Sequence, residues 1–266
     1  MDIIRPRLTD YHGIHKNQAD LDFAIQFFDE DIPLYVDPFL LWKSPSQQDN
    51  ALYTTITNSF NHLNYLIKKK QEDEALSILI DISECHEVGL GVSKTRKGTK
   101  ISEKQAQDIL SLFKDIPEYS QFGFTHFEII QLYISGISKD RISDITCNYL
   151  KSFLIDYTIE QCEINKIPTE GVILDSIYNY KTNKLDTNQK VYLPVNPLTK
   201  EPLIFTPKRW LRFNTWINYE DYFQKYCPRD EIFNPDEPEE RVKVLNFNRE
   251  NYGTIEGYIE YKTKAS

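Results

Sequence analysis

The stretch SPSQQDNALYTTITNSFNHLNYLIKKK, residues 44–70, decides the fold class. Its apolar residues recur at spacings of four, four, three and four, which is the period of one helix face. These residues are Leu52, Ile56, Phe60, Leu63 and Ile67. Ser44, Pro45 and Gln47 form a helix start, with a serine cap and proline in the first turn. The stretch therefore predicts a long amphipathic helix that buries one face.

Comparable patterns predict most of the remaining elements. Helices are expected over residues 72–83, from the capping box at Ser102, over 126–134, over 140–167, after Asn218 and over 242–261. Short β-branched and apolar runs predict strands at 34–37, 172–177, 191–195 and 203–206. We therefore expect an α+β protein, predominantly helical, with a small antiparallel β-rich region around residues 170–207.

The chain also divides by composition. Residues 1–168 are expected to form a mainly helical domain, and 169–227 a β-rich region packed on it. Residues 228–240 hold six acids and three prolines against one arginine, which is typical of an exposed linker. Residues 241–266 are expected to form a C-terminal helix.

Composition excludes several classes. The 266 residues carry a net charge of −9 and are 40% hydrophobic, too apolar for a disordered chain. No apolar run approaches the roughly 20 residues of a membrane helix, and the N-terminus lacks the pattern of a signal peptide. Four widely spaced cysteines are typical of reduced thiols. We therefore expect a cytoplasmic protein that is not embedded in a membrane.

A basic tract follows two closely spaced glycines, Gly89 and Gly91. The acidic balance argues against coating of nucleic acid, but Lys94, Arg96 and Lys97 lie in a segment with four basic residues and no acid. Backbone N–H groups of the glycine turn and these cations would suit a phosphate. The alternative is a flexible, solvated turn, because G-x-G alone matches no complete nucleotide-binding motif.

Two carboxylates four residues apart predict a metal site. Asp140 and Asp144 lie at a helix start and point the same way, with Arg141 beside them to stabilise a phosphate. Three acids are candidates for a third ligand: Asp37, Glu84 and Glu87. Asp37 is preferred because it ends an apolar strand. Such oxygen ligands suit Mg²⁺ or Mn²⁺, which activate water for phosphodiester cleavage.

A structural alternative competes with this site. Asp140 would simply cap the helix, and Asp144 would pair with Arg141 or Lys139. The tripeptide Glu260-Tyr261-Lys262 matches the E-x-K pattern of restriction-type nucleases, but it falls in a predicted helix and a chance match is expected. We do not assign a catalytic role to it.

A second basic segment contains an aromatic residue. Lys208, Arg209 and Trp210 interleave cations with an indole, and Trp216 follows. Such residues would stack on bases and contact phosphates. The alternative is a connection whose aromatics are buried and whose cations are solvated.

Three segments carry a resemblance to a known group of proteins. They are Tyr35-Val36-Asp37-Pro38, Asp140-Arg141-Ile142-Ser143-Asp144 with Asn148, and residues 203–208. Together they resemble the N-terminal region of uncharacterised bacterial proteins, some found near phage-defence genes and some carrying a C-terminal PD-(D/E)xK domain similar to restriction endonucleases. The resemblance implies a role in antiviral defence or nucleic-acid handling. The sequence shows no convincing nuclease core of that type.

Two functions follow as expectations. The first is a defence protein that hydrolyses nucleic acid, with Asp37, Asp140 and Asp144 holding Mg²⁺ or Mn²⁺. The second is a non-catalytic sensor or adaptor that docks a separate ATPase or nuclease subunit. Its motivation is the high aromatic content together with the acidic, proline-containing segment.

Overall fold

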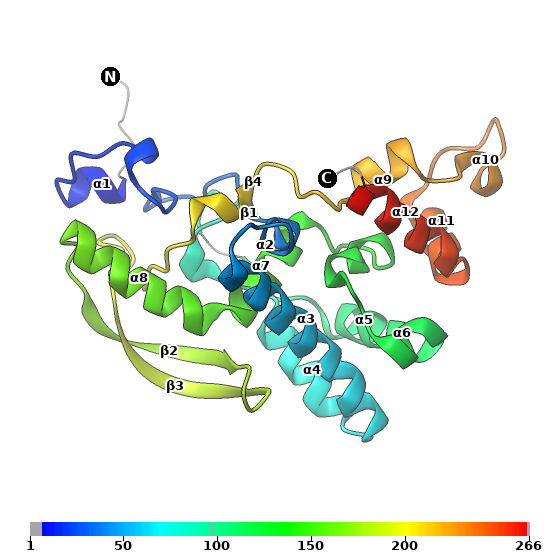
Figure 1. Ribbon diagram of the computed structural model, residues 1–266, viewed down its shortest axis with the longest axis horizontal. Coiled ribbons are helices and arrows are strands. Elements are labelled where there is room, and N and C mark those ends of the chain that lie inside the picture. Colours follow the sequence, from blue (N-terminus) through cyan, green and yellow to red (C-terminus); the bar gives the residue numbers. More distant parts are fainter. Residues whose placement is uncertain (1–6, 97, 265–266) are drawn as a thin grey trace.

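The computed structural model describes residues 7–96 and 98–264 and confirms the mostly helical α+β class (Figure 1). The α-helices are α1 (Leu8–Tyr11), α2 (Pro38–Trp42), α3 (Gln47–Lys68), α4 (Glu72–Asp81), α5 (Glu103–Asp115), α6 (Pro117–Phe122), α7 (Lys139–Tyr149), α8 (Lys151–Asn165), α9 (Tyr219–Lys225), α10 (Arg229–Ile232), α11 (Arg241–Glu250) and α12 (Tyr252–Lys264). The 3-10 helices are η1 (Gln18–Asp20), η2 (His86–Val88), η3 (Phe127–Leu132) and η4 (Lys208–Trp210). The strands are β1 (Tyr35–Val36), β2 (Glu170–Asn179), β3 (Lys184–Leu193) and β4 (Leu211–Arg212).

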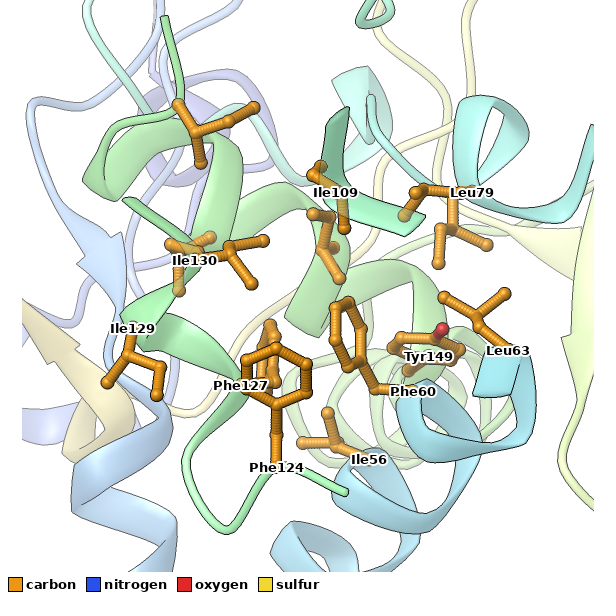
Figure 2. Packing of buried hydrophobic residues seen from close by; sticks show 14 of the residues in the cluster. Ile56, Phe60, Leu63, Leu79, Ile109, Phe124, Phe127, Ile129, Ile130 and Tyr149 are labelled. Atoms are coloured by element: carbon orange, nitrogen blue, oxygen red, sulfur yellow. The ribbon is translucent and has the colours of Figure 1, made fainter. Parts of the chain in front are cut away.

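Helix α3 supplies the predicted apolar face to the main core (Figure 2). Ile56, Phe60 and Leu63 are almost fully buried there, against phenylalanines from α5 and from the segment that leads into η3. Full burial of one such side chain stabilises the fold by about 1.5–3 kcal/mol. The helix begins two residues later than predicted. Ser46 is the cap that accepts the Asp49 N–H, because Ser44 instead donates its hydroxyl to the Asp49 carboxylate.

Strands β2 and β3 form an antiparallel hairpin that lies against α8, at the lower left of Figure 1. This confirms a strand at 172–177 and extends it. The segment 203–206 is buried but forms no ladder. Its backbone N–H groups instead bond irregular partners, with Ile204 donating to the Glu87 carbonyl and Phe205 to the Thr158 hydroxyl. The prediction of a strand there is wrong because buried apolar residues alone do not supply a pairing partner.

Two predicted long helices are each broken in the structure. The expected helix over 140–167 divides into α7 and α8 at Leu150. The expected C-terminal helix divides into α11 and α12 at Asn251, and the acidic segment before it contains the short helix α10. No proline or glycine marks the break at Leu150, whereas Gly253, two residues after Asn251, weakens the prediction of one continuous C-terminal helix.

Short strands hold α7 in place. β1 pairs with β4 in the register Tyr35↔Arg212 and Val36↔Leu211. The edge of β1 that does not pair with β4 meets α7, where the Val36 N–H donates to the Ser143 hydroxyl at 3.0 Å. The start of α7 therefore lies beside both short strands. Within the described part of the chain, no helix combines the length and the apolar character needed to cross a bilayer.

Candidate functional site: an acidic cluster at the start of α7

Four carboxylates gather where α7 begins, and we call them the acidic cluster: Asp31, Glu84, Asp140 and Asp144. Asp31 precedes β1, Glu84 follows α4, and the other two lie on the first turns of α7. A Cβ atom added to Gly91 would lie 2.5 Å from Asp140 Oδ1 and 3.7 Å from Asp31 Oδ2. The glycine thus leaves room for both carboxylates to approach the backbone.

Backbone hydrogen bonds bring Asp31 to this position. The Asp31 N–H donates to the Ser93 carbonyl at 2.9 Å. Ile32 donates to the Gly89 carbonyl at 3.0 Å and accepts from the Gly91 N–H at 2.9 Å. Gly91 has a φ of 124°, which L side chains rarely adopt. The glycine turn is therefore paired with the acidic segment that precedes β1.

Arg141 ties the cluster together. Its Nη1 contacts Glu84 Oε2 at 3.1 Å and Asp144 Oδ2 at 3.4 Å, and it donates to the Ser83 carbonyl. Its Nη2 donates to the Thr99 carbonyl at 2.6 Å. The guanidinium is thus engaged by protein oxygens on several sides. Arg141 acts as a positioning residue between α7, the end of α4 and the basic tract, in place of the direct phosphate contact expected from its sequence position.

The cluster concentrates negative charge. Burial, opposed by Arg96 and assisted by the charges of Asp140 and Glu84, raises the pKa of Asp31 to about 6. Burial also raises the pKa of Asp140, while Arg141 opposes this. The pKa of Asp144 lies well above its usual range because of burial and the charges of Glu84 and Asp140. An additional positive charge at this position would therefore stabilise the ionised cluster.

Asp37 lies outside the cluster. It caps α2 by accepting the Phe39 N–H at 3.1 Å, and it accepts the Trp216 N–H at 2.8 Å. Arg212 lies 3.7 Å from its second oxygen. Burial raises the pKa of Asp37 to about 6, with Glu128 as the acid that contributes most. The third carboxylate beside Asp140 and Asp144 is instead Glu84, one of the three acids proposed from the sequence.

Glu87 forms a separate ion pair and is not a member of the acidic cluster. It is buried and pairs with buried Lys151 at 3.1 Å. Burial would raise the pKa of Glu87, but Lys151, His86 and hydrogen bonds to the carboxylate together hold it below the ordinary value. This ion pair fixes the start of α8 against η2.

The carboxylate oxygens of the cluster are suitable ligands for a hard cation, but they do not form a complete coordination shell. Among residues 7–96 and 98–264, no three His, Cys, Asp or Glu side chains are arranged to hold one metal ion. Mg²⁺ commonly uses only one or two carboxylates and completes its shell with waters and substrate phosphate oxygens. Asp31 and Asp140 are the two half-buried carboxylates that flank Gly91, so they are the residues that would hold such an ion.

The basic tract is only partly exposed. Lys94 is exposed, whereas Arg96 is buried and donates to the carbonyls of Phe27, His86 and Glu87. Lys97 lies outside the described residues. The N–H groups of Gly89 and Gly91 donate to protein carbonyls. The proposed phosphate cradle is therefore unsupported, because both glycine N–H groups and Arg96 stabilise the turn itself.

The second basic segment is mainly structural. Trp210 is 1% exposed and packs against Phe153. Arg209 forms a two-point ion pair with buried Asp49, at 2.9 and 3.0 Å. Lys208 donates to the carbonyls of residues 18 and 19. The aromatic of this segment is thus buried as the alternative interpretation expected, but its cations are paired and not simply solvated.

Sequence reasoning did not single out Asp31, the fourth member of the cluster. It lies in an acidic segment, residues 20–37, but nothing local separates it from its neighbours. Its place depends on the isolated parallel bridge between Ile32 and Leu90, which are 58 positions apart. A contact between residues so far apart in the sequence cannot be predicted from the local periodicity of apolar residues.

Comparison with known proteins shows the family of this chain. The sequence profile of a family described as a domain of unknown function (DUF8370) matches residues 13–218. The chain belongs to this family. No curated protein and no solved structure matches it. The matched range includes the whole acidic cluster, β1 and β4, and ends where α9 is capped.

Proposed function

We propose that this protein acts on nucleic acid and hydrolyses phosphodiester bonds with the help of Mg²⁺ or Mn²⁺. The observation that supports the proposal is the acidic cluster, in which Asp31 and Asp140 flank Gly91 while Glu84 and Asp144 contact Arg141. Perturbed carboxylates in such a constellation are candidates for function. The proposal keeps Asp140 as a cation ligand, as expected from the sequence, and replaces Asp37 by Asp31. It moves Asp144 to a positioning role beside Glu84 and Arg141.

The residues have distinct roles in this proposal. Asp31 and Asp140 hold the cation, which would polarise the phosphate and activate a water. Asp144 and Glu84, both in contact with Arg141, orient the start of α7. Arg141 therefore supports catalysis through these carboxylates. Lys94, exposed on the basic tract, would attract the phosphate backbone.

A cleavage assay tests this function. Wild type is incubated with labelled single-stranded and duplex oligonucleotides, with Mn²⁺, with Mg²⁺ or with EDTA. Asp140→Asn combined with Asp144→Asn should abolish metal-dependent cleavage. Asp175→Asn, an exposed aspartate on β2, is the matched control and should retain it. Full activity of the double variant, or no cleavage by wild type with either metal, would overturn the proposal.

The proposed setting is bacterial antiviral defence in the cytoplasm. It rests on the resemblance carried by residues 35–38, 140–148 and 203–208. The test is a plaque assay in cells that express the chain. A reduction in phage titre that depends on Asp140 and Asp144 supports this setting, and an unchanged titre argues against it.

A second candidate function is a non-catalytic subunit of a protein complex. It is favoured by the engagement of the expected ligand-binding cations, because Arg141, Arg96 and Arg209 all bind protein oxygens. In this case the chain would dock an ATPase or nuclease subunit. Affinity purification from the native host followed by nuclease assay distinguishes the two. Activity that requires a co-purifying ATPase or nuclease and survives Asp140→Asn favours the subunit role.

A further inference from the structure

Phe213 is a large exposed aromatic residue whose backbone carbonyl is bound by the side chain of Lys139, the residue that precedes Asp140. Its side chain is 70% exposed, and it directly follows β4. Its carbonyl accepts a hydrogen bond from Lys139 Nζ at 3.1 Å. Lys139 is the residue before Asp140, so the phenylalanine lies next to the residue pair that starts α7. Single exposed rings are common on protein surfaces, so what distinguishes Phe213 is its contact with the residue that starts α7.

The backbone on both sides of Phe213 is anchored. Arg212 pairs with Tyr35 in the β1–β4 ladder, and its guanidinium lies 5.3 Å from the Trp216 ring. On the other side, Asn214 accepts a hydrogen bond from Lys139. The Lys139 ammonium also lies 4.9 Å from the centre of the Tyr35 ring. The ring is therefore presented by a fixed segment, which lowers the entropic cost of binding a ligand against it.

The chemistry around Phe213 matches one kind of ligand. An aromatic face next to a cation and next to oxygen ligands for a divalent ion suits a base joined to a phosphate. Lys139, whose ammonium binds the Phe213 carbonyl, supplies the cation, and the acidic cluster supplies the oxygens. Bases can stack on a protein ring only where they are unpaired, so this arrangement selects a single strand.

We infer that Phe213 is a stacking platform for one unpaired base of a single-stranded nucleic acid whose neighbouring phosphate lies at the acidic cluster. This inference deepens the proposed function, on which the placement of the phosphate rests. It assigns the substrate class as single-stranded DNA or RNA. Truncating the ring should weaken binding at least about fivefold, since base–aromatic stacking contributes measurably for each base.

Binding to the full chain is measured with single-stranded 12-mers of DNA and of RNA that contain one 2-aminopurine. Ca²⁺ replaces Mn²⁺ so that binding is observed without cleavage. Wild type should quench the 2-aminopurine fluorescence. Phe213→Ala should lose affinity and quenching, and Phe213→Trp should retain both. Phe122→Ala removes a ring that is 75% exposed on α6, and this matched control should bind like wild type.

Wild-type affinity in Phe213→Ala would overturn the inference, as would absence of single-strand binding by wild type or an equal loss in Phe122→Ala. The DNA and RNA arms identify the natural strand. Hydrolysis of bis(p-nitrophenyl) phosphate with Mn²⁺ is measured in parallel, because that substrate has no nucleobase. Its hydrolysis by wild type with unchanged oligonucleotide binding in Phe213→Ala would reject the stacking role and leave the proposed hydrolytic function standing.

Discussion

At the residue scale, the site depends on a glycine that lets two acids approach the backbone. Gly91 has a φ of 124°, and a Cβ atom there would clash with the Asp140 carboxylate. The sequence shows that Gly89 and Gly91 are closely spaced, but it does not indicate their structural role. The N–H groups of these glycines stabilise a turn, and the missing side chain of Gly91 is what matters for the cluster.

Gly91→Ala should therefore destabilise the protein by about 2 kcal/mol or more, because the new Cβ meets Asp140 and the φ angle is strained. Chemical denaturation followed by circular dichroism measures this. Gly253→Ala is the control, since Gly253 lies in α12 and a Cβ there meets no atom within 4 Å. It should leave stability unchanged or raise it by up to about 1 kcal/mol. Equal effects of the two changes would contradict this role of Gly91.

Asp37 carries a second prediction at this scale. Burial raises its pKa to about 6 in the folded protein, above the ordinary value of 3.8. The stability that this proton contributes is complete below about pH 4 and is lost as pH rises through 6. Between pH 4 and 7, the unfolding free energy of wild type should fall relative to that of Asp37→Asn by up to about 3 kcal/mol. Denaturant titrations of both proteins across this range measure the difference, and a constant difference would refute the raised pKa.

At the element scale, local patterns predicted the amphipathic helices but not their breaks. The face of α3, the capping box at Ser102 and the cap at Asn218 are confirmed, because each depends on neighbours within one or two turns. The break between α7 and α8 was missed. It places Lys151 at the start of α8, where its ammonium reaches Glu87 across 64 positions of sequence. Such a distant partner leaves no local pattern.

The buried pair of Glu87 and Lys151 gives a prediction for this junction. Lys151→Met should cost about 3–5 kcal/mol, because it leaves a buried carboxylate without its partner. Adding Glu87→Leu should recover much of that loss. Lys114→Met removes an exposed lysine that pairs with Glu72 at 2.7 Å, and it should change stability by less than about 1 kcal/mol. Denaturation midpoints of the four proteins provide the test. A similar loss in Lys114→Met and Lys151→Met would show that burial of the pair is irrelevant.

At the scale of the whole molecule, the C-terminal helices pack on the main core (Figure 1). Val244, Ile255 and Tyr258 belong to that core. Asn248 donates to the Leu132 carbonyl at 2.7 Å and accepts from the Tyr222 hydroxyl at 2.5 Å. The sequence indicated an acidic connection before these helices. It did not indicate the docking, in which apolar contacts and buried side chains such as Asn248 join segments that are distant in the sequence.

Asn248→Ala should lower the stability of the whole chain by about 2–3 kcal/mol, because two buried polar groups lose their partner. Tryptophan fluorescence and far-UV circular dichroism should shift together in a denaturant titration, as expected for one cooperative unit. Asn251→Ala, which removes only an exposed bond to the Phe247 carbonyl, is the control. Separation of the two transitions in Asn248→Ala would indicate that the C-terminal helices unfold independently.

The claim that Asp31 and Asp140 hold a divalent cation is tested most directly by crystals of the protein soaked in Mn²⁺. The account predicts an anomalous difference peak in contact with an Asp140 carboxylate oxygen, at about 2–2.3 Å, with Asp31 on its other side and waters completing the shell. Crystals of Asp140→Asn grown in the same way should lack the peak. Wild-type crystals with no anomalous peak at the acidic cluster, or with Mn²⁺ bound only elsewhere, would contradict the account.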